Sequence, residues 1–145
     1  MDFGLSFKGE RILGEHKTFR GLFVGIVFSL VIISIQYLIY RLTNYNFAVY
    51  SYEETNFIFL GFLMGFGVII GDAVKSLIKR RFHIPSGKSF IPWDQIDCVL
   101  GGLLFGRIAW NYDWSYALVI IFMTFFLHIS IRHFAFYLGL CDSRW

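Results

Sequence analysis

The amino-acid sequence predicts an all-α membrane protein, a polytopic transmembrane helix bundle of about four spans with both termini on the cytoplasmic side. Of the 145 residues, 57% are hydrophobic and 16% are charged, whereas soluble domains contain roughly 45–50% apolar and about 25% charged residues. A small globule buries only a modest fraction of its area, so it cannot hide this apolar surplus. Long runs without charge and an uneven placement of basic residues point the same way.

Four segments are candidate spans. Three of them contain no Asp, Glu, Lys or Arg, namely Gly21 to Tyr40, Thr55 to Gly71 and Trp114 to Ile131, and a spanning helix needs roughly 17–25 such residues. A fourth run, Ile96 to Asn111, is interrupted by Asp97 and Arg107 and is interpreted as a short or tilted span. The spans are placed near residues 21–42, 56–78, 95–111 and 114–138. Each should be helical, because backbone polar groups in lipid must be satisfied within the segment.

The basic residues predict the orientation. They precede the first span at Lys8, Arg11, Lys17 and Arg20 and follow the second at Lys79, Arg80, Arg81 and Lys88. The loop over residues 44–56 contains Glu53 and Glu54 but no Lys or Arg. The positive-inside rule therefore places the first 20 residues, the loop after the second span and the C-terminus in the cytoplasm. We expect one integral-membrane domain over residues 1–145, passing several times through the cell (plasma) membrane.

A polar stripe continues from the second hydrophobic run. Its members recur at three- and four-residue spacing and so share one helix face: Asp72, Lys75, Ser76, Lys79 and His83. Ionisable residues at membrane depth are costly and usually face a protein interior or a wet cavity. The alternative is a helix end whose Lys and Arg side chains extend to the lipid headgroups. That alternative explains Arg80 and Arg81, but it does not explain Asp72, which lies two turns deeper.

Two further acids, Asp94 and Asp97, lie three residues apart at the start of the third span. Asp94 can be interpreted as a helix N-cap, but capping needs only one acid. Two adjacent carboxylates repel each other unless a cation lies between them. Magnesium takes oxygen ligands and commonly links carboxylates to phosphates. Together with Asp72, the pair therefore predicts a site for a metal ion and a triphosphate.

A third polar group precedes the first span. Lys17, Thr18 and Arg20 offer donors suited to phosphate oxygens. They are equally suited to anchoring the chain on anionic headgroups. On the residues alone, both interpretations stay open.

These motifs together resemble the CDP-archaeol synthase family, whose members are membrane cytidylyltransferases. The stretch from Gly71 to Gly101 carries the pattern Gly-Asp-x-x-x-Ser-x-Ile-Lys-Arg-Arg, then Asp-Gln-x-Asp-x-x-x-Gly. It is also similar to a shortened phosphatidate cytidylyltransferase signature, with Ser76, Lys79, Arg80, Asp94 and Asp97 in place and Gln95 where that signature has Arg. Residues 14–21 resemble the family's Gly-x-Asn-Lys-Thr-x-Arg-Gly motif, with His16 at the Asn position. Residues 138–145 resemble its Leu-Gly-Leu-x-Asp-x-x-Trp ending.

The resemblance implies that a membrane lipid phosphate attacks the α-phosphorus of CTP and releases pyrophosphate. It also implies that Asp94, Asp97 and Lys79 are catalytic, and that Asp72, Asp94 and Asp97 hold one or two Mg²⁺ ions. Lys79, Arg80 and Arg81 would then bind the triphosphate, and Lys17, Thr18 and Arg20 would bind the lipid phosphate or the nucleotide. Ser76 would orient a phosphate or a carboxylate. The expected partners are CTP, the lipid phosphate and the bilayer, with no nucleic acid. Family members usually carry another hydrophobic helix before the position of Asp2.

The acceptor implied is a dialkyl glycerol phosphate of the archaeal type. The alternatives are a phosphatidate cytidylyltransferase acting on diacyl lipid and a non-catalytic, lipid-binding homologue. A CDP-alcohol phosphotransferase is rejected, because the acids that follow Asp97 are at the wrong positions. A transporter is disfavoured, because transporter sites lie near the midplane.

Two charges remain within the spans, Arg107 and Arg132, and we expect a structural role for Arg107.

Overall fold

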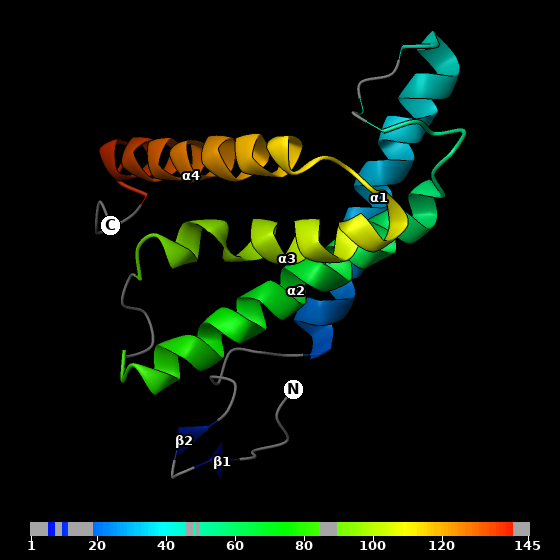
Figure 1. Cartoon of the computed structure of the whole chain (residues 1–145). Helices are drawn as coiled ribbons and strands as arrows, with labels where there is room; N and C mark the ends of the chain where they lie inside the picture. The colour runs from blue at the N-terminus through cyan, green and yellow to red at the C-terminus, as the bar shows by residue number, and fades with distance from the viewer. Residues whose placement is uncertain are drawn as a thin grey trace.

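The arrangement of the chain comes from a computed structural model, which describes residues 6–7, 10–11, 19–45, 48, 50–84 and 90–140. Its elements are β1 (Ser6–Phe7), β2 (Glu10–Arg11), α1 (Phe19–Thr43), α2 (Phe57–Arg81), α3 (Trp93–Ala109) and α4 (Trp114–Tyr137), and Figure 1 shows them in space. The all-α prediction is confirmed for the body of the molecule. Among the described residues, the structure adds the antiparallel pairing of β1 with β2, in which Ser6 lies opposite Arg11.

Helices α1 and α2 pack through small residues in their middle. The Ser29 hydroxyl of α1 donates to the carbonyl oxygen of Gly61 on α2 at 2.8 Å, which satisfies a polar group within the apolar contact. Asn56 caps the start of α2, where its side-chain oxygen accepts the Phe59 amide at 3.1 Å. Beside it lies a buried cluster of Ile33, Tyr50, Tyr52 and Leu60.

Helices α2 and α3 approach more closely, and glycine makes this possible. A Cβ atom on Gly101 of α3 would overlap the carbonyl oxygen of Gly67 on α2, and one on Gly71 would overlap the carbonyl oxygen of Asp97. Small residues at such crossings allow two backbones in a membrane to come together. The contact continues directly into the polar end of both helices, so it determines how near their charged side chains lie.

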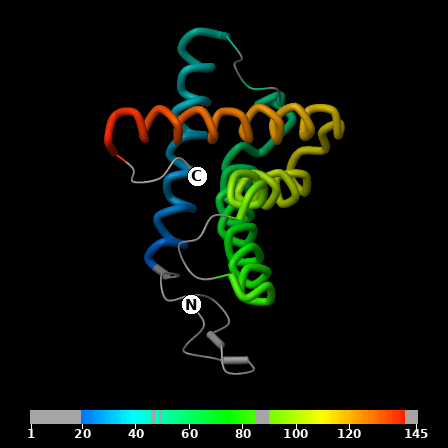
Figure 2. The backbone as a smooth tube through the Cα atoms, turned by 90° about the vertical axis from the view of Figure 1, so that its left-hand side faces the viewer, coloured from blue at the N-terminus to red at the C-terminus, as the bar shows by residue number. Residues whose placement is uncertain are grey.

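Helix α4 is attached to α3 at its N-terminal end. Arg107 of α3 donates to the carbonyl oxygen of Tyr112, and its guanidinium lies 4.4 Å from the ring centroid of Trp114. The structural role predicted for Arg107 is therefore confirmed. Ala117 is the buried residue of α4, and the helix runs across α1 rather than alongside it (Figures 1 and 2).

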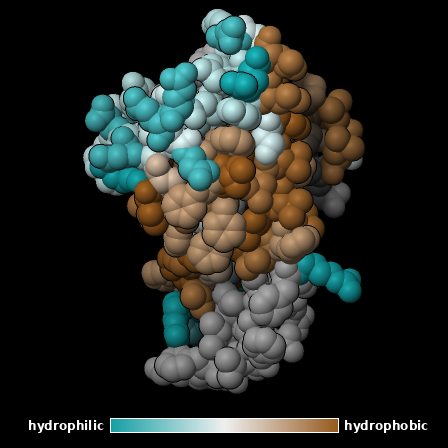
Figure 3. Space-filling view, turned by 90° about the vertical axis from the view of Figure 1, so that its right-hand side faces the viewer, coloured by the Kyte–Doolittle hydropathy of each residue, from teal (hydrophilic) through white to brown (hydrophobic). Residues whose placement is uncertain are grey.

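Three of the helices are long and apolar enough to cross a membrane, namely α1, α2 and α4. On the face in Figure 3, hydrophobic side chains cover the middle of the molecule and hydrophilic ones gather at its upper end. Helix α3 has 17 residues and carries Asp94, Asp97 and Arg107, so its interpretation as a short span stays a prediction. The protein is therefore a helical membrane protein.

One detail of the sequence interpretation was wrong. His83 was placed on the polar stripe of α2, but the helix ends at Arg81 and His83 has a φ of 54°. Its amide donates to the carbonyl of Arg80, and the Ile84 amide donates to that of Lys79. These two bonds satisfy the last carbonyls of the helix and turn the chain back, as a left-handed residue after a helix commonly does.

Candidate functional site

Three aspartates from two helices meet beside the close contact of α2 and α3. Asp72 lies on α2, and Asp94 and Asp97 lie on the first turns of α3. We call these three residues the acidic cluster. Because Gly71 packs on the Asp97 backbone, the polar stripe of α2 faces the start of α3. The sequence predicted that these acids act together, and they do share one site.

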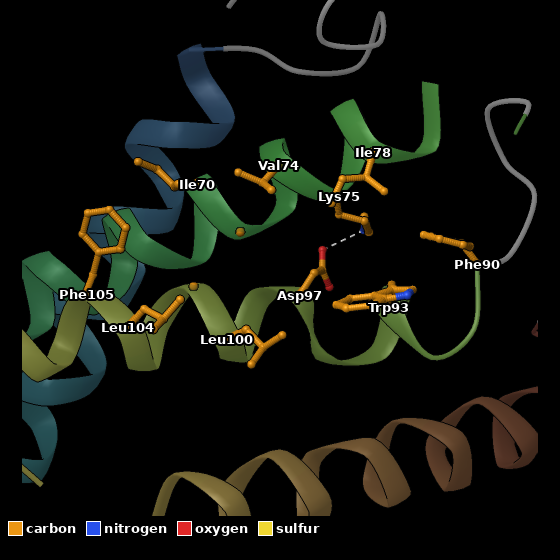
Figure 4. A pocket seen from close by; sticks show the side chains of 12 residues that line it. Ile70, Val74, Lys75, Ile78, Phe90, Trp93, Asp97, Leu100, Leu104 and Phe105 are labelled. Atoms are coloured by element: carbon orange, nitrogen blue, oxygen red, sulfur yellow. Dashed lines mark ion pairs between the residues drawn. The ribbon is translucent and has the colours of Figure 1, made fainter. Parts of the chain in front are cut away.

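The centre of the acidic cluster holds the side chain of Lys75. Its Nζ atom lies 2.8 Å from Asp97 Oδ2, 3.2 Å from Asp72 Oδ1 and 3.4 Å from Asp94 Oδ1. Figure 4 shows the ion pair with Asp97 between the two helices. Lys79, one turn further along α2, lies 3.2 Å from Asp94 Oδ2. Two ammonium groups thus balance much of the charge of three carboxylates.

Lys75 is the residue that sequence reasoning missed. Helical spacing predicted its place on the polar stripe, but the residue was not assigned to the site. The signal was its spacing, since Lys75 follows Asp72 by one helical turn. Its contacts with Asp94 and Asp97 join residues of different helices, so they depend on how α2 and α3 cross.

Asp94 is held by its own turn as well as by the lysines. Its Oδ2 accepts a hydrogen bond from the Phe90 amide at 2.7 Å. Asp94 therefore binds the segment that leads into α3, and it does not make the usual side-chain hydrogen bond of a helix N-cap. Burial alone would raise the pKa of Asp94. The Phe90 hydrogen bond and the charges of Lys79 and Lys75 outweigh burial and hold the pKa below its ordinary value of 3.8. Asp94 is therefore ionised throughout the physiological range.

Asp97 is the most enclosed of the three acids, with a side chain that is 5% exposed, compared with 22% for Asp94 and 33% for Asp72. A carboxylate in such surroundings needs a cation partner, because desolvation of an unpaired charge is costly. Lys75 supplies that partner. The more exposed Asp72 and Asp94 leave the cluster open to solvent on one side.

The remaining predicted residues lie in different surroundings. Ser76 donates its hydroxyl to the carbonyl oxygen of Asp72 at 2.8 Å, which places it in the site but on its own helix backbone. Arg80 is half-buried and Arg81 is exposed, both in the last turn of α2. Lys17 and Thr18 lie outside the described residues. Arg20 is exposed at the start of α1, and no contact of Arg20 with the acidic cluster is present in the described part of the chain.

The magnesium site stays a prediction. Carboxylate oxygens are the ligands that magnesium prefers, so the donor chemistry of the acidic cluster fits the ion. Among the described residues, however, no three Asp, Glu, His or Cys side chains are placed to hold one ion together. The oxygens surround the Lys75 ammonium instead.

An apolar cavity of about 210 Å³ adjoins the acidic cluster, between α2 and α3 (Figure 4). Lys75 and Asp97 are its charged lining residues. The other side chains that line it are hydrophobic, among them Val74, Trp93 and Leu100. A molecule with a charged head and an apolar tail would find both environments here, within a few ångströms of each other.

Comparison with known proteins gives a consistent family. The CDP-archaeol synthase (CarS-like) family model matches residues 1–145. The chain is 33% identical to the CDP-archaeol synthase of Methanocaldococcus jannaschii over 146 residues, covering all of this chain and 82% of that protein. It is 34% identical over 151 residues to that of Archaeoglobus fulgidus, covering all of this chain and 83% of the relative. For Saccharolobus islandicus the identity is 31% over 147 residues, with all of this chain and 81% of the relative covered.

No solved structure matches the chain. The family assignment depends instead on the whole-length sequence match. That match spans the helices that form the site, including the acids at Asp72, Asp94 and Asp97. The chain belongs to the CDP-archaeol synthase family.

Proposed function

We propose that this protein transfers CMP from CTP to the phosphate of a membrane lipid of the dialkyl glycerol phosphate type, giving a CDP-lipid and pyrophosphate for phospholipid synthesis. The observation that carries the proposal is the meeting of acidic, basic and apolar groups between α2 and α3. Acids and lysines suit a nucleotide and its metal ion, and the adjoining cavity suits a lipid chain. The relatives' name supplies the reaction class.

The reaction needs little covalent help. An oxygen of the lipid phosphate forms a bond to the α-phosphorus of CTP, and the bond from that phosphorus to the bridging oxygen breaks, so the electron pair leaves with pyrophosphate. A phosphate monoester has a second pKa near ~6, so the acceptor is largely dianionic near neutral pH. No general base is required, and the difficulty lies in bringing two polyanions together.

The side chains of the site address that difficulty by position and charge. Lys79, Arg80 and Arg81 lie in the last turns of α2 and are proposed to bind the triphosphate. Lys17, Thr18 and Arg20 are proposed to hold the lipid phosphate or the nucleotide, and Ser76 to orient a phosphate. The carboxylates of Asp72, Asp94 and Asp97 would hold magnesium, which when bound would neutralise charge on the triphosphate.

The cavity gives the acceptor a direction of approach. Its wall of Val74, Leu100 and Leu104 is apolar, and Asp97 and Lys75 are its charged lining residues. A lipid chain lying against this wall would bring the phosphate to this charged pair. The proposed cytoplasmic position of the pair agrees with the basic residues after α2.

The test is pyrophosphate release by purified protein in detergent, with CTP and magnesium. Two acceptors are compared: an unsaturated diether glycerol phosphate and a diacyl phosphatidic acid. We expect turnover with the diether. Turnover with the diacyl lipid alone would identify a phosphatidate cytidylyltransferase. Turnover with neither, by protein that remains folded, would contradict the catalytic proposal and leave a lipid-binding role.

A further inference from the structure

Lys75 lies at the centre of the acidic cluster and takes no part in the reaction as proposed above. Its ammonium contacts one oxygen of each aspartate, at 2.8, 3.2 and 3.4 Å. An ammonium group is a compact charge with three donors, which matches three converging carboxylate oxygens. A divalent cation bound to the same acids would need oxygens that Lys75 now contacts.

A divalent ion and the Lys75 ammonium would compete for these oxygens. Three carboxylates and the ammonium groups of Lys75 and Lys79 leave the cluster with one net negative charge. Like charges only a few ångströms apart repel strongly where water is scarce. The donor set fits a divalent ion by its chemistry, yet no three acidic side chains are placed around a common ion among the described residues. The side chain that fills the place is Lys75.

We propose that Lys75 is an internal cation that keeps the acidic cluster assembled, and that a divalent ion binds there by displacing the Lys75 ammonium. Lys75 is thus a positioning residue that competes with the metal. The inference rests on the proposed function only in assuming that the acidic cluster binds a divalent ion.

The surroundings of Lys75 allow this exchange. Its side chain is 18% exposed and lines the cavity of about 210 Å³ next to the acidic cluster. The four-carbon stem of lysine is flexible, and the cavity wall is otherwise apolar apart from Asp97. The displaced ammonium can therefore move along the cavity mouth, where a lipid phosphate would meet it.

The first experiment measures Mn²⁺ binding to the purified protein in detergent, by loss of the free-ion electron paramagnetic resonance signal, with neither CTP nor lipid present. Lys75→Met removes the competing charge, so its dissociation constant for Mn²⁺ should fall by at least about tenfold. Arg41→Met is the matched control, because it removes one positive charge from an exposed position in the last turn of α1, a helix that carries none of the acidic cluster. Screening by salt should limit its effect to less than about threefold. Affinity in Lys75→Met that equals or falls below the wild-type value overturns the proposal.

A second measurement uses the wild-type protein, so it does not depend on the folding of a variant. Acetic anhydride labels accessible amines, and mass spectrometry compares Lys75 with Lys79 with and without Mn²⁺. We expect labelling of Lys75 to rise several-fold on Mn²⁺ binding and to exceed any change at Lys79. If Mn²⁺ binds while Lys75 labelling stays constant or falls, the exchange does not occur.

Neither readout uses CTP or an acceptor, so the two proposals can fail separately. Mn²⁺-dependent release of Lys75 in a protein without turnover would contradict the proposed function alone. Turnover in a protein whose Mn²⁺ affinity is unchanged by Lys75→Met would contradict the exchange alone.

Discussion

Asp97 is the residue on which the site depends most directly. Its carboxylate is nearly enclosed and contacts Lys75 at 2.8 Å, and the backbone next to it lies against Gly71. Asp97→Asn keeps the shape and removes the charge, so pyrophosphate release should fall by at least about 10²-fold, the usual loss for a single electrostatic group in a site. Asp113→Asn, at the exposed start of α4, should retain activity. Near-normal turnover in Asp97→Asn would remove Asp97 from the site.

Asp94 predicts a pH dependence of stability. Its pKa is lowered in the folded protein, so its ionised form stabilises the fold above the ordinary value of 3.8, and this stabilisation is lost as pH falls through the lower folded value. Asp94→Asn should therefore destabilise the protein by about 1–2 kcal/mol at neutral pH. Thermal unfolding in detergent should show the gap to wild type closing only below pH 3.8. A gap that closes between pH 7 and 5 would contradict the assignment.

At the scale of elements, the contact of α2 with α3 positions the site. A methyl group on Gly101 would overlap backbone atoms of Gly67, whereas one on Gly102 would meet the Val68 side chain at 3.2 Å. Gly101→Ala should cost about 1–3 kcal/mol of stability, as overpacking does. It should also lower turnover about 10²-fold, because small displacements of catalytic groups are costly. Gly102→Ala is the control and should have a smaller effect on melting temperature and pyrophosphate release. Equal effects would mean that the close approach at Gly101 does not position the acidic cluster.

At the scale of the whole molecule, orientation in the membrane decides whether the site can reach CTP. Single cysteines at Glu54 and His83, both exposed, test it in a background where Cys98 and Cys141 are replaced. A membrane-impermeant maleimide should label Glu54→Cys in intact cells and His83→Cys only after permeabilisation. The reverse pattern would place the site outside the cell and contradict the proposed orientation. Retained pyrophosphate release in the background variant shows that its fold is intact.

Much of this protein follows from the order of its residues. Apolar runs predicted where α1, α2 and α4 lie, because a backbone in lipid must form helices. Helical spacing predicted that Asp72 and Ser76 share one face of α2, and that Asp94 and Asp97 share one face of α3. The charged motifs then predicted a site at the polar ends of these helices, and their pattern resembled the family to which the chain belongs.

The tertiary structure decided how those faces meet. Periodicity identifies one face of a helix, but it does not identify the face of the partner helix or the depth of the contact. The close approach at Gly67 and Gly101 determines that the Lys75 ammonium reaches acids on α3. The end of α2 at Arg81, which removes His83 from the stripe, depends on local backbone geometry. The sequence alone determined that Asp72, Asp94 and Asp97 are candidates for one site, whereas the crossing of α2 and α3 determined that a lysine lies among their carboxylates.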